Sequence, residues 1–305
     1  MNGQGKNTLR GWLELIRLPN IFTVPGDVLA GYVITWPLHT GGWSDLFAAM
    51  LAVIFLYLAG LIINDLVDVK RDRQERPDRP LPSGRVRVNS ARMLAAGFMT
   101  AALVLLASRT MDMLFSGIVL GCLIFIYNMW ARCSRWTGAI IMGLCRAASV
   151  GMGVVSASVD GLTEFLSVGV MIWWAIYIGS VSWLAAREME EGAYGRERWW
   201  PLLIIAVGGT IIMYLSGSDN GQSTARSVMA FAFAGLIAWQ SGIRLRMKAP
   251  HYHAPVMGWL ISALIPMQAG MVVLFGREPW MLLAALLILF GWPLHRWLTK
   301  SFAAS

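Results

Sequence analysis

Residues 46–63 read LFAAMLAVIFLYLAGLII, and residues 64–80 follow directly as NDLVDVKRDRQERPDRP. The first segment is almost wholly apolar and approaches the length of about 20 residues that a helix needs to cross a bilayer. The second segment places a dense group of acidic and basic side chains at the end of that helix. Together they predict a membrane helix whose last turns carry a charged cluster at the membrane surface.

The composition extends this prediction from one helix to the whole chain. Of the 305 residues, 57% are hydrophobic and 14% are charged, whereas a soluble domain carries about 25% charged residues. Apolar runs occur at residues 18–38, 45–64, 91–108, 112–130, 136–156, 165–187, 198–216, 226–243, 257–275 and 279–297. We therefore expect one all-α domain over residues 1–305, a polytopic membrane bundle of nine to ten transmembrane helices. The count stays open because one run could be re-entrant.

The basic residues predict the orientation of this bundle. If the N-terminus is cytoplasmic, the loops on the other side hold only Arg109, Arg226 and Arg277, and Arg146 lies inside a run. All other lysines and arginines then fall on the cytoplasmic side, as the positive-inside rule expects. The net charge of +8 therefore reflects topology and membrane lipids, and nucleic acid is not an expected partner.

The charged segment has a regular spacing. Asn64, Asp68, Asp72 and Arg76 recur every four residues, so a helix places them on one face with about 6 Å of rise between neighbours. Carboxylate oxygens at that spacing suit Mg²⁺, which is commonly bound by one or two carboxylates together with substrate phosphate oxygens. Pro77 is expected to end the helix. The pattern indicates an enzyme that binds a diphosphate at a membrane surface. The alternative is a charged helix end that is merely hydrated.

The motif Asn64-Asp65-x-x-Asp68-x-x-x-Asp72, followed by RPLPSG at residues 79–84, resembles the first aspartate-rich motif of the UbiA superfamily of intramembrane prenyltransferases. Two further segments are similar to this family: RLPN at residues 17–20, and Tyr127-Asn128-x-x-x-Arg132, where the family has Tyr-Ser and a basic residue. Residues 142–146, MGLCR, resemble its EboC branch, although Ser149 stands where an asparagine is expected.

The resemblance implies a helix bundle around a cavity open to lipid, in the cytoplasmic (inner) membrane with the site opening to the cytoplasm. The implied activity is Mg²⁺-dependent transfer of an isoprenyl group from an isoprenyl diphosphate donor to a small-molecule acceptor. Asn64, Asp68 and Asp72 would bind the metal and act in catalysis together with Arg132. The implied substrate-binding residues are Arg17, Asn20, Asp65, Arg76 and Arg79.

The chain departs from the family at the second aspartate motif, which usually follows the sixth helix. No aspartate occurs between residues 160 and 219, and residues 186–192 read AREMEEG. Glu188 and Glu191 lie three residues apart, on one face of a helix, and glutamate can bind Mg²⁺. Either Glu188, with Glu191 or Glu190, replaces the second metal and substrate site, or these glutamates form an ordinary charged helix end.

Arg146 stands inside an apolar run. An ionisable residue at membrane depth is costly and usually faces a cavity or a partner. We interpret Arg146 as a cavity-facing, substrate-binding residue, and pairing with backbone carbonyls is the alternative. A second functional hypothesis is a transporter, or a binding protein for isoprenoids or lipid phosphates, that keeps the fold without catalysis. The missing second aspartate motif supports that hypothesis, and no residue pattern selects the acceptor or the isoprenoid length.

Overall fold

The computed structural model describes residues 2–16, 18–35, 38–130, 134–187, 194–217, 221–246, 253–276 and 279–302. Every regular element in these ranges is a helix, which confirms the predicted all-α fold. The α-helices are α1 (Asn2–Leu15), α2 (Val24–Ile34), α3 (Trp43–Glu75), α4 (Val88–Ala107), α5 (Met111–Met129), α6 (Arg135–Ala157), α7 (Phe165–Ala185), α8 (Trp200–Leu215), α9 (Gly221–Arg244), α10 (His253–Ser262), α11 (Leu264–Phe275) and α12 (Pro279–Phe302). Short 3-10 helices are η1 (Leu18–Thr23), η4 (Val159–Thr163) and η5 (Arg196–Trp199).

Much of the bundle surface is apolar. Within the described residues, seven helical segments are long and apolar enough to cross a membrane, and shorter apolar helices cover Ile21–Ile34 and Met281–Pro293. Large apolar side chains point outward, for example Phe115 at 68% and Phe290 at 75% exposure. A surface of this kind matches a hydrocarbon surrounding and not water. The expected count of nine to ten spans stays a prediction.

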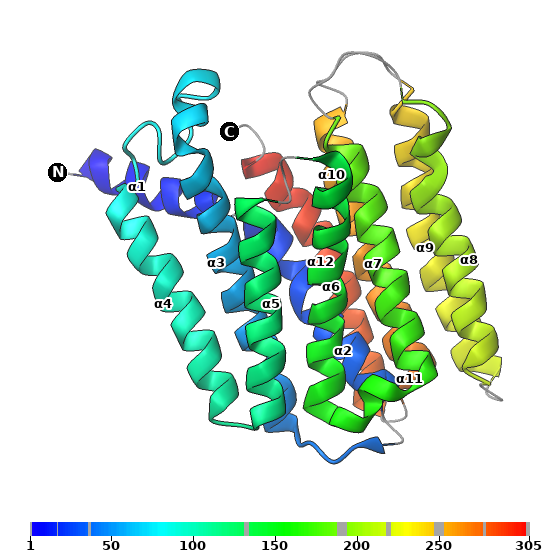
Figure 1. The fold of residues 1–305 in the computed structure, drawn as a ribbon. Helices are drawn as coiled ribbons and strands as arrows, with labels where there is room; N and C mark the ends of the chain where they lie inside the picture. The colour runs from blue at the N-terminus through cyan, green and yellow to red at the C-terminus, as the bar shows by residue number, and fades with distance from the viewer. Residues whose placement is uncertain are drawn as a thin grey trace.

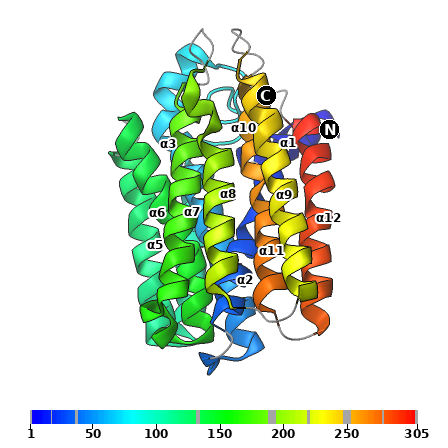
Figure 2. The ribbon, with the colours of Figure 1, turned by 90° about the vertical axis from the view of Figure 1, so that its right-hand side faces the viewer.

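The long helices stand side by side, and the two ends of the bundle differ (Figure 1 and Figure 2). The N-terminal helix α1, the end of α3 and the end of α12 lie together at the top of Figure 1. The connection between α4 and α5 lies at the opposite end, with the chain between α2 and α3. The segments that the charge pattern assigns to the cytoplasm therefore share one end.

Helix α3 is longer than the apolar run that predicts it. Its 33 residues extend over about 50 Å at 1.5 Å per residue, whereas the hydrocarbon core of a bilayer is about 30 Å thick. The helix ends as predicted, because Arg76 precedes a proline and is excluded from the helical region. The Arg76 N–H still donates to the carbonyl of Asp72 at 2.8 Å, which is the last helical hydrogen bond of α3. The aspartates thus lie on regular helix beyond the apolar segment.

Helices α2 and α6 approach each other backbone to backbone. A Cβ atom placed on Gly31 would lie 2.0 Å from the carbonyl oxygen of Val150, and one on Gly153 would lie 1.9 Å from that of Val28. Small residues at helix interfaces permit this close approach in membrane proteins. The contact sets the spacing between the two helices that carry Asp27 and Arg146.

The predicted run at residues 257–275 corresponds to the apolar segment Val256–Phe275, within which α10 ends at Ser262 and α11 begins at Leu264. Pro266 explains the break, because it lacks an N–H and its ring would clash with the carbonyl four residues earlier, that of Ser262. The predicted run at residues 18–38 comprises η1 and the short helix α2, whose first turn accommodates Pro25.

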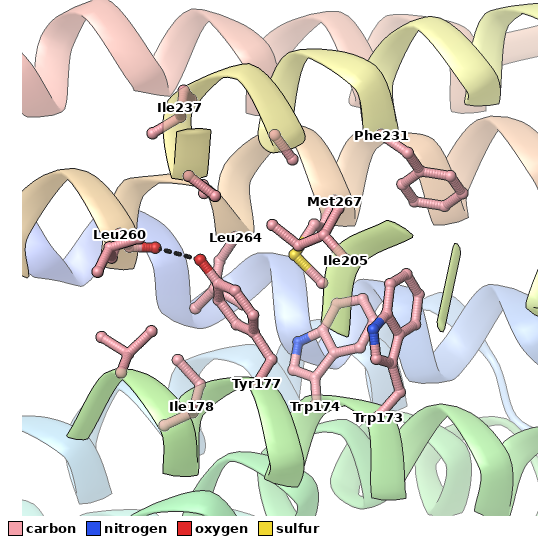
Figure 3. Packing of buried hydrophobic residues seen from close by; sticks show 14 of the residues in the cluster. Trp173, Trp174, Tyr177, Ile178, Ile205, Phe231, Ile237, Leu260, Leu264 and Met267 are labelled. Carbon is pink, nitrogen blue, oxygen red and sulfur yellow. Dashed lines mark hydrogen bonds between the residues drawn. The ribbon is translucent and has the colours of Figure 1, made fainter. Parts of the chain in front are cut away.

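The largest buried cluster packs around α7. Trp173 and Trp174 are buried side by side, with Phe231 of α9 against the ring of Trp173 and Met267 of α11 nearby (Figure 3). The hydroxyl of Tyr177 donates to the carbonyl of Leu260 at 2.6 Å, close to the break between α10 and α11 (Figure 3). This core holds α7 and α11 against α2, and so forms the back of the site described below.

Candidate active site

The aspartates of the predicted motif lie on the inner side of the last turns of α3. Asp65 and Asp68 are each 8% exposed and Asp72 is 2% exposed, while the neighbouring Arg71 and Arg73 are exposed. Burial of a carboxylate is costly unless it is paired or bound to a cation. This burial favours a binding site over a merely hydrated helix end.

Arginine side chains neutralise part of the carboxylate charge. The Nη1 atom of Arg79 donates to Oδ2 of Asp72 at 2.8 Å and lies 3.9 Å from Oδ1 of Asp65. Arg71 lies 3.7 Å from Asp68 on the exposed side of the helix. Guanidinium N–H groups donate hydrogen bonds to carboxylate and phosphate oxygens alike. The N–H of Arg79 that now bonds Asp72 could therefore bond a phosphate oxygen in its place.

The loop that follows α3 has a defined conformation. The backbone N–H of Ser83 donates to the carbonyl of Arg79 at 3.0 Å. Gly84 adopts a φ of 75°, a left-handed conformation that glycine reaches without steric cost. Arg85 then binds Glu14 of α1 at 2.7 Å. These contacts hold Arg79 next to the aspartates.

A cavity of about 140 Å³ lies beside this face of α3. The lining residues come mainly from α2, α3, α5 and α6: Val24, Val53, Tyr57, Gly60, Leu61, Asn64, Leu120, Ile124, Tyr127, Asn128, Met142, Cys145, Arg146 and Ser149. Asn64 belongs to this wall and precedes Asp68 by one helical turn, so the cavity and the carboxylates are adjacent.

Arg146 lines the cavity and is also paired inside the protein. Its Nη1 atom donates to Asp27 and, at 3.2 Å, to the carbonyl of Thr23, and its Nη2 atom donates to the Thr23 hydroxyl at 2.8 Å. The centre of the guanidinium lies 5.9 Å from the ring of Tyr57. Arg146 thus lines the cavity and also bonds a backbone carbonyl, and its role in substrate binding stays a prediction.

Asp27 was not anticipated from the sequence. It is fully buried, and its Oδ1 atom accepts from Trp174 at 2.9 Å and from Gln268 at 2.7 Å. The signal that could have found it is the rule that points to Arg146, because an acidic residue inside an apolar run is equally costly. The two charges neutralise each other, so the deep end of the cavity has no net charge from this pair.

Several predicted site residues cannot be placed. Arg17, Arg132, Glu188, Glu190 and Glu191 lie outside the described residues.

Asn20 lies within η1, and no side-chain contact of it is described. Arg76 caps α3 with an exposed side chain. The structure brings Asp65 and Asp72 together with Arg79. The roles of all these residues in binding remain predictions.

The family model described as the UbiA prenyltransferase family matches residues 28–241. Among curated proteins, the digeranylgeranylglyceryl phosphate synthase of Sulfolobus acidocaldarius is 32% identical over 188 residues, which cover 61% of this chain and 63% of that relative. The synthase of the same name from Methanocaldococcus jannaschii is 35% identical over 97 residues, covering 32% of this chain and 34% of the relative. The matched segments thus span less than two thirds of each of these two relatives.

Solved structures show the same fold. A UbiA homolog from Aeropyrum pernix K1 superposes with a TM-score of 0.63 at 15% identity, covering 83% of this chain and 97% of that one. A UbiA homolog from Archaeoglobus fulgidus, bound to GPP and Mg²⁺, superposes with a TM-score of 0.60 at 13% identity, covering 85% and 99%. At these identities the likeness concerns the fold alone. Placement in the EboC branch stays a prediction.

Proposed function

Because the chain belongs to the UbiA prenyltransferase family, whose model matches residues 28–241, we propose that it transfers an isoprenyl group from an isoprenyl diphosphate to an acceptor within the membrane. The observation that carries this proposal is the burial of Asp65, Asp68 and Asp72 beside a cavity whose wall includes Asn64. The diphosphate would bind at the aspartates, and the hydrocarbon chain would enter the apolar part of the cavity.

Asp68 and Asp72 are the residues proposed to hold Mg²⁺, with Asn64 as a neighbouring oxygen ligand. This ion is commonly bound by one or two carboxylates plus phosphate oxygens. The described residues contain no group of three or more His, Cys, Asp or Glu side chains that could hold a metal. A Mg²⁺ ion bound by two carboxylates and the diphosphate does not require such a group. When bound, Mg²⁺ neutralises charge on the diphosphate as it leaves.

The chain's own residues would position the donor and exclude water. One N–H of Arg79 would switch its hydrogen bond from Asp72 to a diphosphate oxygen, since the Nη1 atom already lies among the aspartates. The apolar wall, including Val53, Leu120 and Ile124, would keep water from the allylic cation, which water would otherwise capture. In the reaction the bond between C1 and the diphosphate oxygen breaks, a bond from C1 to the acceptor forms, and the acceptor loses a proton.

The acceptor class is suggested by the relatives. Their name, digeranylgeranylglyceryl phosphate synthase, describes a product with two geranylgeranyl groups on glyceryl phosphate. Removing one group leaves geranylgeranylglyceryl phosphate, an alcohol. We take this alcohol as the first acceptor to test, with geranylgeranyl diphosphate as the donor.

The test uses purified protein, Mg²⁺, labelled geranylgeranyl diphosphate and this alcohol, with product and released diphosphate both quantified. The proposal expects Asp68→Ala and Asp72→Ala to abolish both. Asp112→Ala is the matched control, because Asp112 is an exposed aspartate at the opposite end of the bundle, in the first turn of α5. If the two variants form product at the wild-type rate, the proposed mechanism is wrong.

The transporter hypothesis rests on the absence of the second aspartate motif from the sequence, where residues 186–192 read AREMEEG. It predicts movement of a labelled lipid phosphate across sealed vesicles without release of diphosphate.

In cells we expect an inner-membrane protein with a cytoplasmic N-terminus, which cysteine labelling of α1 from either side of the membrane would test.

A further inference from the structure

The cavity has polar side chains at two levels. Asn64, Tyr127 and Asn128 lie toward the end at which the aspartates stand. Tyr57 and Arg146 lie deeper, because Tyr57 precedes Asn64 by seven residues on α3, which corresponds to about 10 Å along the helix axis. The wall between the two levels is mostly apolar. A nucleophile that attacks next to the diphosphate must therefore meet the upper level.

Asn128 has a buried amide with a defined orientation. The residue is 3% exposed, and its Nδ2 atom donates to the carbonyl of Ile124 at 2.9 Å. Only the NH₂ half of an amide can donate to a carbonyl, so this bond fixes which atom is the oxygen. Among the described residues, the Oδ1 atom has no hydrogen-bond partner.

An unpartnered buried oxygen in a cavity wall calls for an explanation. Most buried polar atoms in native proteins are hydrogen-bonded, and leaving one unpaired costs stability. Asn128 could avoid this cost as leucine, which is apolar and of similar size. Asn128 and Asn64 line the same cavity. A ligand that donates a hydrogen bond to Oδ1 would explain why asparagine stands at position 128.

The chemistry of the two reactants identifies that ligand. The amide oxygen only accepts hydrogen bonds. An ionised diphosphate offers acceptor oxygens, and an isoprenyl chain offers no polar hydrogen. Of the two substrates, only the acceptor can carry a polar hydrogen, as O–H or N–H. The alcohol that the relatives' name suggests carries an O–H that can donate to Oδ1 of Asn128.

We propose that Asn128 accepts a hydrogen bond from the nucleophilic hydroxyl of an alcohol acceptor and thereby orients it toward C1 of the isoprenyl diphosphate. This inference rests on the proposed function and sharpens it, because it names the residue that holds the hydroxyl of the alcohol, and the product is then an ether. The hydroxyl oxygen bonds to C1, the bond from C1 to the diphosphate breaks, and the hydroxyl proton leaves with the diphosphate or through solvent. Asn128 orients the hydroxyl and takes up no proton.

The test compares Asn128→Leu, which removes the acceptor atom, with Asn128→Ser, which restores an oxygen on a shorter side chain. With geranylgeranylglyceryl phosphate as the probe, Asn128→Leu should raise the KM for this alcohol about 2- to 12-fold, the range of a typical net hydrogen bond. The KM for geranylgeranyl diphosphate and the half-saturating Mg²⁺ concentration should stay unchanged. Asn128→Ser should recover part of the loss.

A stability measurement separates this role from a structural one. Within the described residues, Asn128→Leu loses the bond from Nδ2 to the carbonyl of Ile124 and no partner of Oδ1. Because it also removes an unpaired buried oxygen, the variant should unfold at about the same detergent concentration as wild type. Asn89→Leu is the control, since Asn89 is an exposed asparagine on α4, outside the cavity, and it should alter neither KM.

Three results would overturn the inference: an unchanged KM for the alcohol in Asn128→Leu, a shift in Mg²⁺ or donor dependence instead, or a lower stability that Asn128→Ser corrects without any change in KM. These are distinct from failure of the proposed function, in which wild-type protein releases no diphosphate with the alcohol present.

Discussion

The ion pair between Asp27 and Arg146 makes a quantitative prediction about stability. Asp27 is fully buried, with 0% of its surface accessible, and Arg146 is 9% exposed. Arg146→Met removes the guanidinium and leaves a buried carboxylate that only Trp174 and Gln268 still satisfy. We expect this variant to be strongly destabilised, because an uncompensated charge remains away from water.

The magnitude follows from measured buried pairs. Removing one partner costs about 3–5 kcal/mol, whereas replacing both partners by uncharged groups is often close to neutral. Asp27→Asn keeps an oxygen for Trp174 and Gln268 and removes the charge. The double variant Asp27→Asn/Arg146→Met should therefore be at least about 2 kcal/mol more stable than Arg146→Met alone.

The assay is unfolding by SDS in mixed micelles, followed by tryptophan fluorescence, for wild type, both single variants and the double variant. Arg109→Met is the matched control. Arg109 binds Asp45 at 2.8 Å and the hydroxyl of Ser44 at 2.6 Å at the far end of the bundle, with 33% of its side chain exposed. A pair of that exposure contributes about 0–1 kcal/mol.

Two outcomes would refute the reasoning. If Arg146→Met costs no more than Arg109→Met, then Asp27 is not held as a buried charge. If the double variant is as unstable as Arg146→Met, the loss comes from packing of the arginine side chain and not from the uncompensated carboxylate. Because the double variant should fold, its activity also shows whether Arg146 contacts substrate.

The remaining predictions concern the metal, the donor, helix packing and the second site. Chelation by EDTA should abolish product formation, and added Mg²⁺ should restore it; retained turnover in EDTA would exclude a divalent cation. Arg79→Gln should lower kcat/KM for the isoprenyl diphosphate about 10- to 100-fold, since a hydrogen bond to a charged group contributes about 1.5–3 kcal/mol, and an equal loss for the acceptor would contradict this. Gly153→Leu should destabilise the bundle by about 1–3 kcal/mol through overpacking in SDS titration, whereas Gly97→Leu, with no atom near its missing Cβ, should not. Glu188→Gln should lower turnover if this residue replaces the second motif, and wild-type turnover would assign it to a charged helix end.

The features that sequence predicts well depend on near neighbours in the chain. The aspartate face of α3 follows from a four-residue period on a helix, and its end follows from Pro77. The corresponding runs predict α5 and α6 to within one residue at each end. Pro266 was equally visible, so the break between α10 and α11 could have been predicted from the proline rule.

The features that were missed depend on residues far apart in the chain. Arg146 meets Asp27 and Thr23 across more than a hundred residues, and Gln268 joins them from α11. A single sequence shows that each polar residue lies in an apolar run but not which of them meet. The open oxygen of Asn128 is likewise apparent only once its neighbours are placed.

Helix α3 is one continuous helix from Asp45, near one end of the bundle, to Asp72, near the other. Asp72 stands 27 positions after Asp45, which fixes a separation of about 40 Å that the protein cannot shorten without breaking the helix. A bilayer of different thickness must then be met by tilting or by deformation of the lipid. The acyl-chain length of the surrounding lipids therefore sets how far Asp68 and Asp72 stand clear of the hydrocarbon, and with it how readily a charged diphosphate arriving from water can reach them.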